Sequence, residues 1–312
     1  MHDDITDIPG IRVGHDTNLE AGTGCTVILC DTPAMGGVDV RGGAPATRET
    51  DLLRPMTLVE GVNAIVLTGG SAFGLDAASG VMLYLEERGI GYDTSVARVP
   101  IVPAAAIFDL AFGSASIRPD ASAGYRACEQ ASSEPVAQGT VGAGTGATVG
   151  KMAGPDFMMK GGLGSASMLL SDGTLVGAIV VVNAVGDIVD PQTQTVIAGT
   201  RSPDFLAGNP FGNTTIAVVA INAALTKEQT NKVAQMAHDG MAQAIRPAHT
   251  MFDGDTVFAL ALGPGSQILH GSPIAAMHIS AIGAAAAATL ARAIVKAVRN
   301  ATTLHGVPAV HS

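Results

Sequence analysis

The chain has 312 residues, of which 47% are hydrophobic and only 14% are charged, so it can bury a large core and is not an intrinsically disordered chain. Its formal net charge of −10 argues against nucleic acid as a partner, because binding phosphate backbones requires clustered Lys and Arg. The first residues lack the basic and apolar regions of a signal peptide, and the three cysteines have no metal-type spacing, so the sequence predicts a cytoplasmic protein with reduced thiols.

Short apolar runs rich in β-branched residues recur between Gly, Asp, Asn or Pro, a pattern typical of buried strands. In chain order the sequence predicts strands at Cys25–Cys30 and Ala64–Thr68, a helix at Leu75–Arg88, strands at Leu175–Val182 and Thr215–Ile221, a helix at Thr226–Ile245, a strand at Thr256–Leu262 and a helix at Ala275–Asn300. Strands and helices do not alternate strictly, so periodicity leaves open a layered αββα sandwich and an α/β sheet.

Two of the predicted helices have distinctive features. The helix predicted at Thr226–Ile245 opens with a capping box at Thr226 and Gln229 and stops before Pro247. The last is the most apolar long stretch of the chain, but Ala dominates it and several polar side chains interrupt it. A packed helix explains this composition better than a membrane span, so no membrane partner is expected.

Several familiar site motifs nearly match and fail at one position. Ser71 lies between a strand and a helix, like the nucleophile of a hydrolase elbow, but Phe73 stands where the elbow needs Gly. A tight turn is the better interpretation, and Ser71 is the second choice as nucleophile. Lys151 follows a Gly-rich loop, but Met152 replaces the Ser or Thr of a phosphate-binding loop. The run Asp253-Gly254-Asp255 lacks the further ligands of a calcium loop, so no metal or cofactor is expected.

The most informative segment is a Gly-Asn turn that runs directly into a buried strand beginning with Thr214 and Thr215. Strand initiation alone accounts for it, since Asn favours turns and Thr favours strands. Chemistry offers a second interpretation. If the chain breaks between Asn213 and Thr214, the new α-amine becomes a general base on the same residue as the hydroxyl. Its reference pKa of about 7.7–8.0 suits that task near neutral pH.

Eight ordered blocks spread over nearly the whole chain carry a family resemblance. They are Ile5–His15, Val38–Pro45, Leu67–Leu75, Gly144–Ala147, Gly150-Lys151, Val181–Gly186, Gly212–Thr215 and His249–Thr256. Together they resemble the self-processing aminopeptidases typified by DmpA and the β-aminopeptidases, especially the branch of nylon-oligomer (6-aminohexanoate oligomer) hydrolases. The resemblance implies a four-layer αββα sandwich like that of N-terminal-nucleophile hydrolases, with different connectivity. It also implies a single domain that is self-cleaved into residues 1–213 and 214–312, and a homo-oligomer, often a tetramer.

The resemblance also implies residue roles. Thr214 would be the nucleophile of both self-cleavage and catalysis, and Asp253 and Asp255 would orient and polarise the new N-terminus. Asn183 would donate its side-chain amide to the oxyanion, and Lys151 would hold the Thr214 hydroxyl and amine while lowering their proton affinity. The aminopeptidase branch has a Ser nucleophile and a Ser/Glu pair at these positions, so this chain departs from it.

The expected activity is hydrolysis of linear amides, from peptides to nylon-type oligomers, through an acyl-enzyme on Thr214. Phe73, which stands where several relatives place a Tyr near the substrate, and Ser71 are the expected substrate-binding residues. Three alternatives remain open at this point: an aminopeptidase that releases N-terminal residues, an acyl transferase of the ornithine-acetyltransferase type, and a non-enzymatic binding protein.

Overall fold

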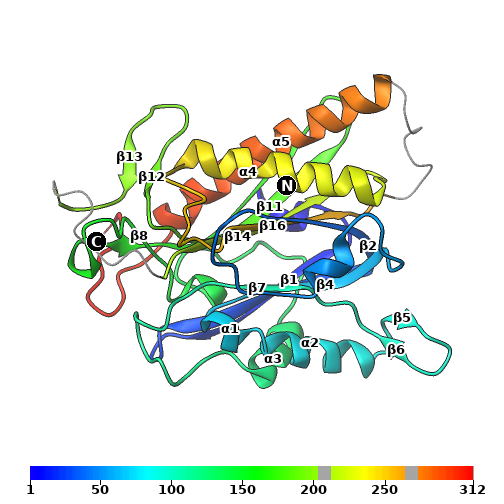
Figure 1. The fold of residues 1–312 in the computed structure, drawn as a ribbon, viewed down its shortest axis with the longest axis horizontal. Helices are drawn as coiled ribbons and strands as arrows, with labels where there is room; N and C mark the ends of the chain where they lie inside the picture. The colour runs from blue at the N-terminus through cyan, green and yellow to red at the C-terminus, as the bar shows by residue number, and fades with distance from the viewer. Residues whose placement is uncertain (203–211, 264–272, 312) are drawn as a thin grey trace.

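The computed structural model describes residues 1–202, 212–263 and 273–311 (Figure 1). Its α-helices are α1 (Ser71–Gly74), α2 (Ala77–Glu86), α3 (Ala121–Glu129), α4 (Lys227–Ala244) and α5 (Pro273–Arg299). The connected main-sheet strands are β1 (Ile11–Asn18), β2 (Thr23–Val40), β3 (Thr47–Arg48), β4 (Gly61–Thr68), β7 (Ala104–Ala106), β10 (Gly162–Leu169), β11 (Leu175–Asn183), β14 (Thr214–Ile221) and β16 (Thr256–Ala261). Shorter strands outside it are β5 (Tyr92–Asp93), β6 (Arg98–Val99), β8 (Thr148–Val149), β9 (Met159–Lys160), β12 (Asp187–Val189), β13 (Val196–Ala198) and β15 (Ile245–Arg246).

These elements stack in four layers (Figure 1). Helices α4 and α5 cover a β-layer of β10, β11, β14 and β16; a second β-layer of β1, β4 and β7 follows, and α1, α2 and α3 cover its other side. The long strand β2 joins the two β-layers, because its Cys25–Leu29 part pairs with β4 and its Met35–Val40 part pairs with β16. The αββα sandwich expected from the resemblance is therefore confirmed.

The central strands are buried on both faces, which explains why they are apolar along their whole length. On β14, Ile216 and Val218 belong to the apolar cluster between the two β-layers, while Ala217 and Val219 belong to the cluster beneath α4 and α5. A third cluster lies between the second β-layer and helices α2 and α3. The predicted active-site edge is thus attached to a rigid, doubly covered sheet.

All five predicted strands are confirmed, as parts of β2, β4, β11, β14 and β16, although β16 ends at Ala261, one residue before the predicted end. The three predicted helices correspond to α2, α4 and α5, with α2 shorter at both ends than predicted. The capping box at the start of α4 is present: the Thr226 hydroxyl accepts the Gln229 N–H, and the Gln229 side chain accepts the Thr226 N–H. Ala275–Arg299 of α5 is long and apolar enough to cross a membrane, yet 72% of its most apolar window is buried inside the protein.

Several elements were not predicted from the sequence, among them β1, α3 and β10. Helix α3 is short, and β10 alternates Gly and Ser with its apolar residues, which hides the strand pattern. The small residues of β10 have a packing reason. A Cβ on Gly164 would lie 2.1 Å from the carbonyl oxygen of Ala293, so only glycine allows α5 to approach the strand this closely.

Candidate active site

The ends of three neighbouring strands meet at one edge of the β-layer beneath α4 and α5. Strands β11 and β14 pair antiparallel, so that Asn183, the last residue of β11, lies opposite Thr214, the first residue of β14. Strands β14 and β16 run parallel, and an isolated bridge extends this pairing to Asn213 and Asp253. Strand register therefore brings together side chains that are far apart in the sequence.

Thr214 is buried in the uncut chain, with only 4% of its surface exposed. Its hydroxyl donates a hydrogen bond to the carbonyl oxygen of Asn213, which belongs to the predicted scissile bond. The same oxygen accepts the backbone N–H of Gly254 at 3.2 Å. A Cβ at Gly254 would lie 2.9 Å from the Thr214 hydroxyl oxygen, so the site is closely packed. One buried position therefore holds the Thr214 hydroxyl, the carbonyl that it would attack and a backbone N–H donor to that carbonyl.

Lys151 and Asn183 together hold a different carbonyl, that of Gly212. Lys151 Nζ donates to this oxygen at 2.9 Å, and Asn183 Nδ2 donates to it at 3.1 Å. Lys151 Nζ also donates to the side-chain oxygen of Asn183 at 2.7 Å, which fixes the orientation of the amide. Burial lowers the pKa of Lys151 to about 7. In the uncut chain, the two predicted donors thus bind the carbonyl one residue upstream of the predicted scissile bond rather than the Thr214 hydroxyl.

The loop that carries Lys151 is fixed to the end of β11. The backbone N–H of Lys151 donates to the carbonyl of Val185 at 2.9 Å, and that of Gly150 donates to the carbonyl of Gly186 at 3.0 Å. The backbone N–H of Thr148 donates to the Asn183 side-chain oxygen at 3.0 Å. The Asn183 oxygen is therefore already occupied by donors, and its Nδ2 is the group that points toward the Gly212 carbonyl.

Asp253 and Asp255 lie beside the junction, and both are buried. Asp255 accepts the backbone N–H of Thr215 on one oxygen at 2.7 Å, and its other oxygen bonds to His249. Asp253 accepts the backbone N–H of Thr250 at 2.6 Å. Burial and the neighbouring Asp255 raise the pKa of Asp253. The pair borders the peptide around Thr214, as the predicted role requires, although Asp255 contacts it through the next residue.

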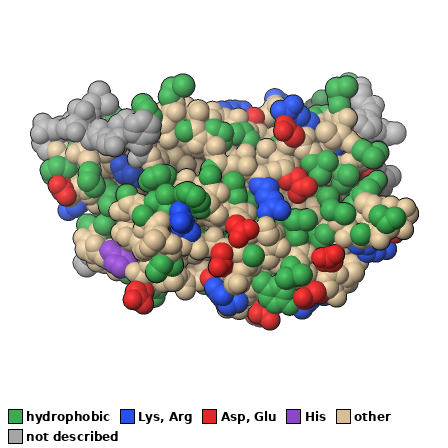
Figure 2. Space-filling view, turned by 60° about the horizontal axis from the view of Figure 1, so that its bottom comes forward, with side chains coloured by type: hydrophobic (Ala, Val, Ile, Leu, Met, Phe, Trp, Pro, Cys, Tyr) green, Lys and Arg blue, Asp and Glu red, His purple; other side chains and the backbone are tan. Residues whose placement is uncertain are grey.

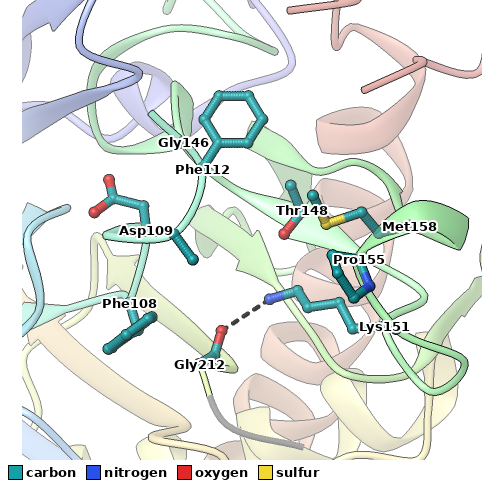
Figure 3. A pocket seen from close by; sticks show the side chains of 11 residues that line it. Phe108, Asp109, Phe112, Gly146, Thr148, Lys151, Pro155, Met158 and Gly212 are labelled. Atoms are coloured by element: carbon teal, nitrogen blue, oxygen red, sulfur yellow. Dashed lines mark hydrogen bonds between the residues drawn. The ribbon is translucent and has the colours of Figure 1, made fainter. Parts of the chain in front are cut away.

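A cavity of about 210 Å³ lies next to this junction (Figure 3). Its apolar wall residues are Phe108, Ala111, Phe112, Pro155 and Met158. Figure 3 shows the Lys151 ammonium reaching toward the Gly212 carbonyl, and both residues line the cavity. Thr214 is buried and is not among the lining residues, so the cavity meets the uncut chain at Gly212, just upstream of Thr214.

Ser71 and Phe73, the predicted substrate-binding residues, do not line this cavity. Ser71 begins α1 with a left-handed φ of 55°, and its backbone N–H donates to the carbonyl of Ile107 at 2.9 Å, as a tight turn requires. The Phe73 side chain is 62% exposed, and the Arg118 guanidinium lies 3.9 Å from its ring centre. In a single chain these two residues are therefore not brought together with Lys151 and Asn183.

Two side chains at the site were not singled out from the sequence. His249 bonds to Asp255, and it could have been found as the first residue of its sequence block. Lys160 is fully buried and donates to the carbonyls of Thr145 and Ala147 at 2.7 Å each, which ties down the Gly-rich loop before Lys151. A lone Lys at the end of the two-residue strand β9 carries no sequence signal for this role.

The surface charges in Figure 2 and the state of the cysteines are those that the composition of the sequence indicates. On the described part of the face in Figure 2, acidic, basic and hydrophobic side chains are interspersed and form no extended basic patch. The three cysteines are free and buried. Among residues 1–202, 212–263 and 273–311, no group of three or more His, Cys, Asp or Glu side chains is arranged to hold a metal ion.

Comparison with known proteins gives concordant matches. The model of peptidase family S58 matches residues 3–311. An uncharacterized aminopeptidase of Mycobacterium tuberculosis is 46% identical over 97% of this chain and 96% of that protein. A 6-aminohexanoate-oligomer endohydrolase of Agromyces sp. is 34% identical over 81% of this chain and 73% of that protein.

Solved structures show the same fold. A β-aminopeptidase of Burkholderia sp. matches with a TM-score of 0.75 and 25% identity, covering 100% of this chain and 91% of the other. An L-aminopeptidase D-Ala-esterase/amidase of Ochrobactrum anthropi, described as a variant of the Ntn hydrolase fold, matches with a TM-score of 0.75 and 20% identity. That match covers 98% of this chain and 88% of the other, and it concerns the fold.

Proposed function

The chain belongs to peptidase family S58 and is a hydrolase, and we propose that it cuts itself between Asn213 and Thr214 and then hydrolyses linear amides with Thr214 as N-terminal nucleophile. The names of its relatives support this substrate class, because an aminopeptidase and a 6-aminohexanoate-oligomer endohydrolase both act on amide bonds. A homotetramer and a cytoplasmic location stay predictions from the sequence.

One observation carries the proposal: the Thr214 hydroxyl bonds to the carbonyl of the peptide bond that joins Thr214 to Asn213. The contact places the hydroxyl of the residue that follows this bond beside the carbonyl that it would attack. The carbonyl also accepts the Gly254 N–H, which would stabilise the negative charge that develops on the oxygen. The Gly254 bond also belongs to the parallel pairing of Asn213 with Asp253, so the hydroxyl contact is the one that favours the proposal over simple strand initiation.

Self-cleavage then proceeds in two steps. The Thr214 oxygen attacks the carbonyl carbon of Asn213, its proton passes to the Thr214 nitrogen, and the C–N bond breaks to leave an ester and a free α-amine. Water hydrolyses the ester, which leaves a carboxylate on Asn213 and restores the hydroxyl of Thr214. The first step needs no group outside the chain.

Turnover uses the products of that cleavage. The new α-amine accepts the hydroxyl proton while the Thr214 oxygen attacks a substrate carbonyl, and the departing amine takes the proton back. Water then hydrolyses the acyl-enzyme. Lys151 and Asn183 are the donors available for the substrate oxyanion, once the Gly212 carbonyl has left them.

The covalent state of the purified protein tests the proposal directly. We expect two fragments, residues 1–213 and 214–312, that elute together as one particle because β11, β14 and β16 form a continuous sheet across the cut. Intact mass spectrometry combined with size-exclusion chromatography measures both properties. Active protein that contains only the full-length chain would rule out the N-terminal threonine mechanism.

The cavity favours hydrolysis of amides without recognition of a free N-terminal ammonium, which a strict aminopeptidase requires. Asp109 is the only carboxylate among its described lining residues, and it is 5% exposed. Its two oxygens accept the backbone N–H of Gly70 and the hydroxyl of Thr23, both at 2.7 Å. In Figure 3 the Asp109 carboxylate points away from Lys151. This carboxylate is therefore poorly placed to bind the free ammonium of a substrate.

We accordingly expect N-acetylated oligoamides to be hydrolysed at rates comparable to those of the free-amine forms. A dedicated aminopeptidase rejects capped substrates, because its buried ammonium-binding carboxylate would be left unpaired. The measurement is the ratio of kcat/KM for capped and uncapped forms of one short oligomer. A ratio below about one in a thousand, or roughly 4 kcal/mol, would establish the aminopeptidase alternative and leave the Thr214 mechanism untouched.

A further inference from the structure

The two carboxylates beside Thr214, those of Asp253 and Asp255, differ in the hydrogen bonds that hold them in place. Both oxygens of Asp255 are engaged: one accepts the Thr215 N–H at 2.7 Å, and the other accepts the backbone N–H of His249 at 3.0 Å and its ring Nδ1–H at 2.8 Å. The hydrogen bonds to Asp253 come from Thr250, whose backbone N–H donates to it at 2.6 Å. Within the described residues, His249 thus supplies two of the three N–H donors to the Asp255 carboxylate, which holds the backbone next to Thr214.

The hydrogen on the His249 ring is assigned by its surroundings. Nδ1 faces a carboxylate and therefore carries the hydrogen, while Nε2 is buried without a hydrogen-bond partner in the described part of the chain. The ring is therefore a hydrogen-bond donor to Asp255.

A second histidine holds the ring in place. The His238 ring, fully buried on α4, packs edge-on against the His249 ring with centroids 4.8 Å apart. His238 Nε2 lies 2.9 Å from the carbonyl oxygen of Asp39 in β2, so it carries the hydrogen of a bond that anchors the pair to the sheet. His249 itself has a left-handed φ of 59°, which fixes its backbone in a sharp turn. These contacts leave the imidazole one orientation toward Asp255.

We infer that His249 is a positioning residue for both self-cleavage and turnover: through Asp255 it fixes the Thr215 N–H and thereby the first residue of β14. The inference rests on the proposed role of Thr214. Cutting the bond between Asn213 and Thr214 does not alter the Thr215 N–H. The same contact to Asp255 therefore serves both the uncut precursor and the mature enzyme. Without the ring, the second Asp255 oxygen keeps only a backbone donor, and the carboxylate can rotate away from Thr215.

The test compares His249→Gly with His249→Asn. Both residues tolerate a left-handed backbone, but only Asn places an N–H donor near the position of Nδ1. We expect His249→Gly to slow self-cleavage and to lower kcat on the order of 100-fold, the effect of a misplaced reacting group. KM should stay within about twofold, because His249 does not line the cavity. His249→Asn should recover most of both rates.

His278→Asn is the matched control. His278 pairs with Asp172 at 3.0 Å, so it is also a histidine–aspartate contact, but it lies on α5 away from the junction. This variant should be cut and should turn over like the unaltered protein. Circular dichroism and Tm should show that all variants are folded.

Rates for His249→Gly within about threefold of the unaltered protein would overturn the inference, as would an Asn variant no better than the Gly variant. If the Gly variant is folded but stays uncut, the Asn variant decides: cleavage restored supports the inference, and an uncut Asn variant overturns it. Thr214→Ala is assayed in parallel. Its retention of activity would remove the proposed function itself, whereas an inactive Thr214→Ala beside a fully active His249→Gly removes only the role of His249.

Discussion

Thr214→Ala should leave the chain whole and reduce amide hydrolysis by a factor on the order of 10⁶, the loss typical when a catalytic nucleophile is removed. The substitution deletes the one hydroxyl that bonds to the Asn213 carbonyl, and it leaves the backbone of β14 unchanged. No cut means no free α-amine, so nucleophile and base disappear together. Intact mass and a product assay with a short oligoamide measure the two effects separately.

Two further variants identify the residue responsible. Thr214→Ser keeps the hydroxyl and the future amine, so it should still be cut, more slowly because serine is held less firmly at χ1 than threonine. Thr215→Ala should still be cut at the same bond, because the Thr215 hydroxyl has no hydrogen-bond partner in the described part of the chain. Full activity of Thr214→Ala would transfer the role of nucleophile elsewhere, with Ser71 the first residue to examine.

The strands that carry the site could be read from the sequence for a physical reason. β11, β14 and β16 are buried on both faces, so their apolar residues form continuous runs between turn residues. β10 could not be read in this way, because Gly164 and its small neighbours serve the close approach of α5 and interrupt the apolar pattern. Local sequence pattern therefore reveals a strand that is buried on both faces, but it does not reveal a strand whose small residues are required by a closely packed helix.

The grouping of the site residues could not be derived from local pattern. Asn183 and Thr214 are opposite one another only because β11 and β14 pair in one register, and Asp253 joins them only because β16 runs parallel to β14. The resemblance supplied these residues together. It did not indicate that in the uncut chain Lys151 and Asn183 bind the Gly212 carbonyl, which depends on the path of a single turn.

Lys151→Met should lower kcat about 10²–10³-fold, the effect of losing one donor to a developing oxyanion. Methionine matches the unbranched stem but removes the ammonium that bonds to the Gly212 carbonyl and to the Asn183 oxygen. Because the Asn183 amide also loses the cation that orients it, both donors weaken together. A Lys151→Met enzyme that is cut and keeps kcat within about threefold would exclude this role.

The pH profile gives a sharper test of the same residue. Burial lowers the pKa of Lys151 to about 7, so its ammonium is present below that pH and is lost as pH rises through it. The Thr214 amine must lose its proton to act as base, so activity should rise with pH on the acid side and fall on the alkaline side, giving a bell-shaped profile. Lys151→Met should keep the acid limb and lose the alkaline one.

Chemical rescue separates the ammonium from the rest of the side chain. Lys151→Cys, alkylated with bromoethylamine, places an ammonium on a stem of nearly the same length, and the three native cysteines are buried and so protected from the reagent. We expect the alkylated enzyme to regain most of the lost kcat. Its alkaline limb should move to lower pH, because the sulfur atom withdraws electrons and makes the ammonium more acidic. Recovered activity with an unmoved alkaline limb would assign that limb to another group and show that Lys151 acts by its hydrogen bonds rather than by its charge.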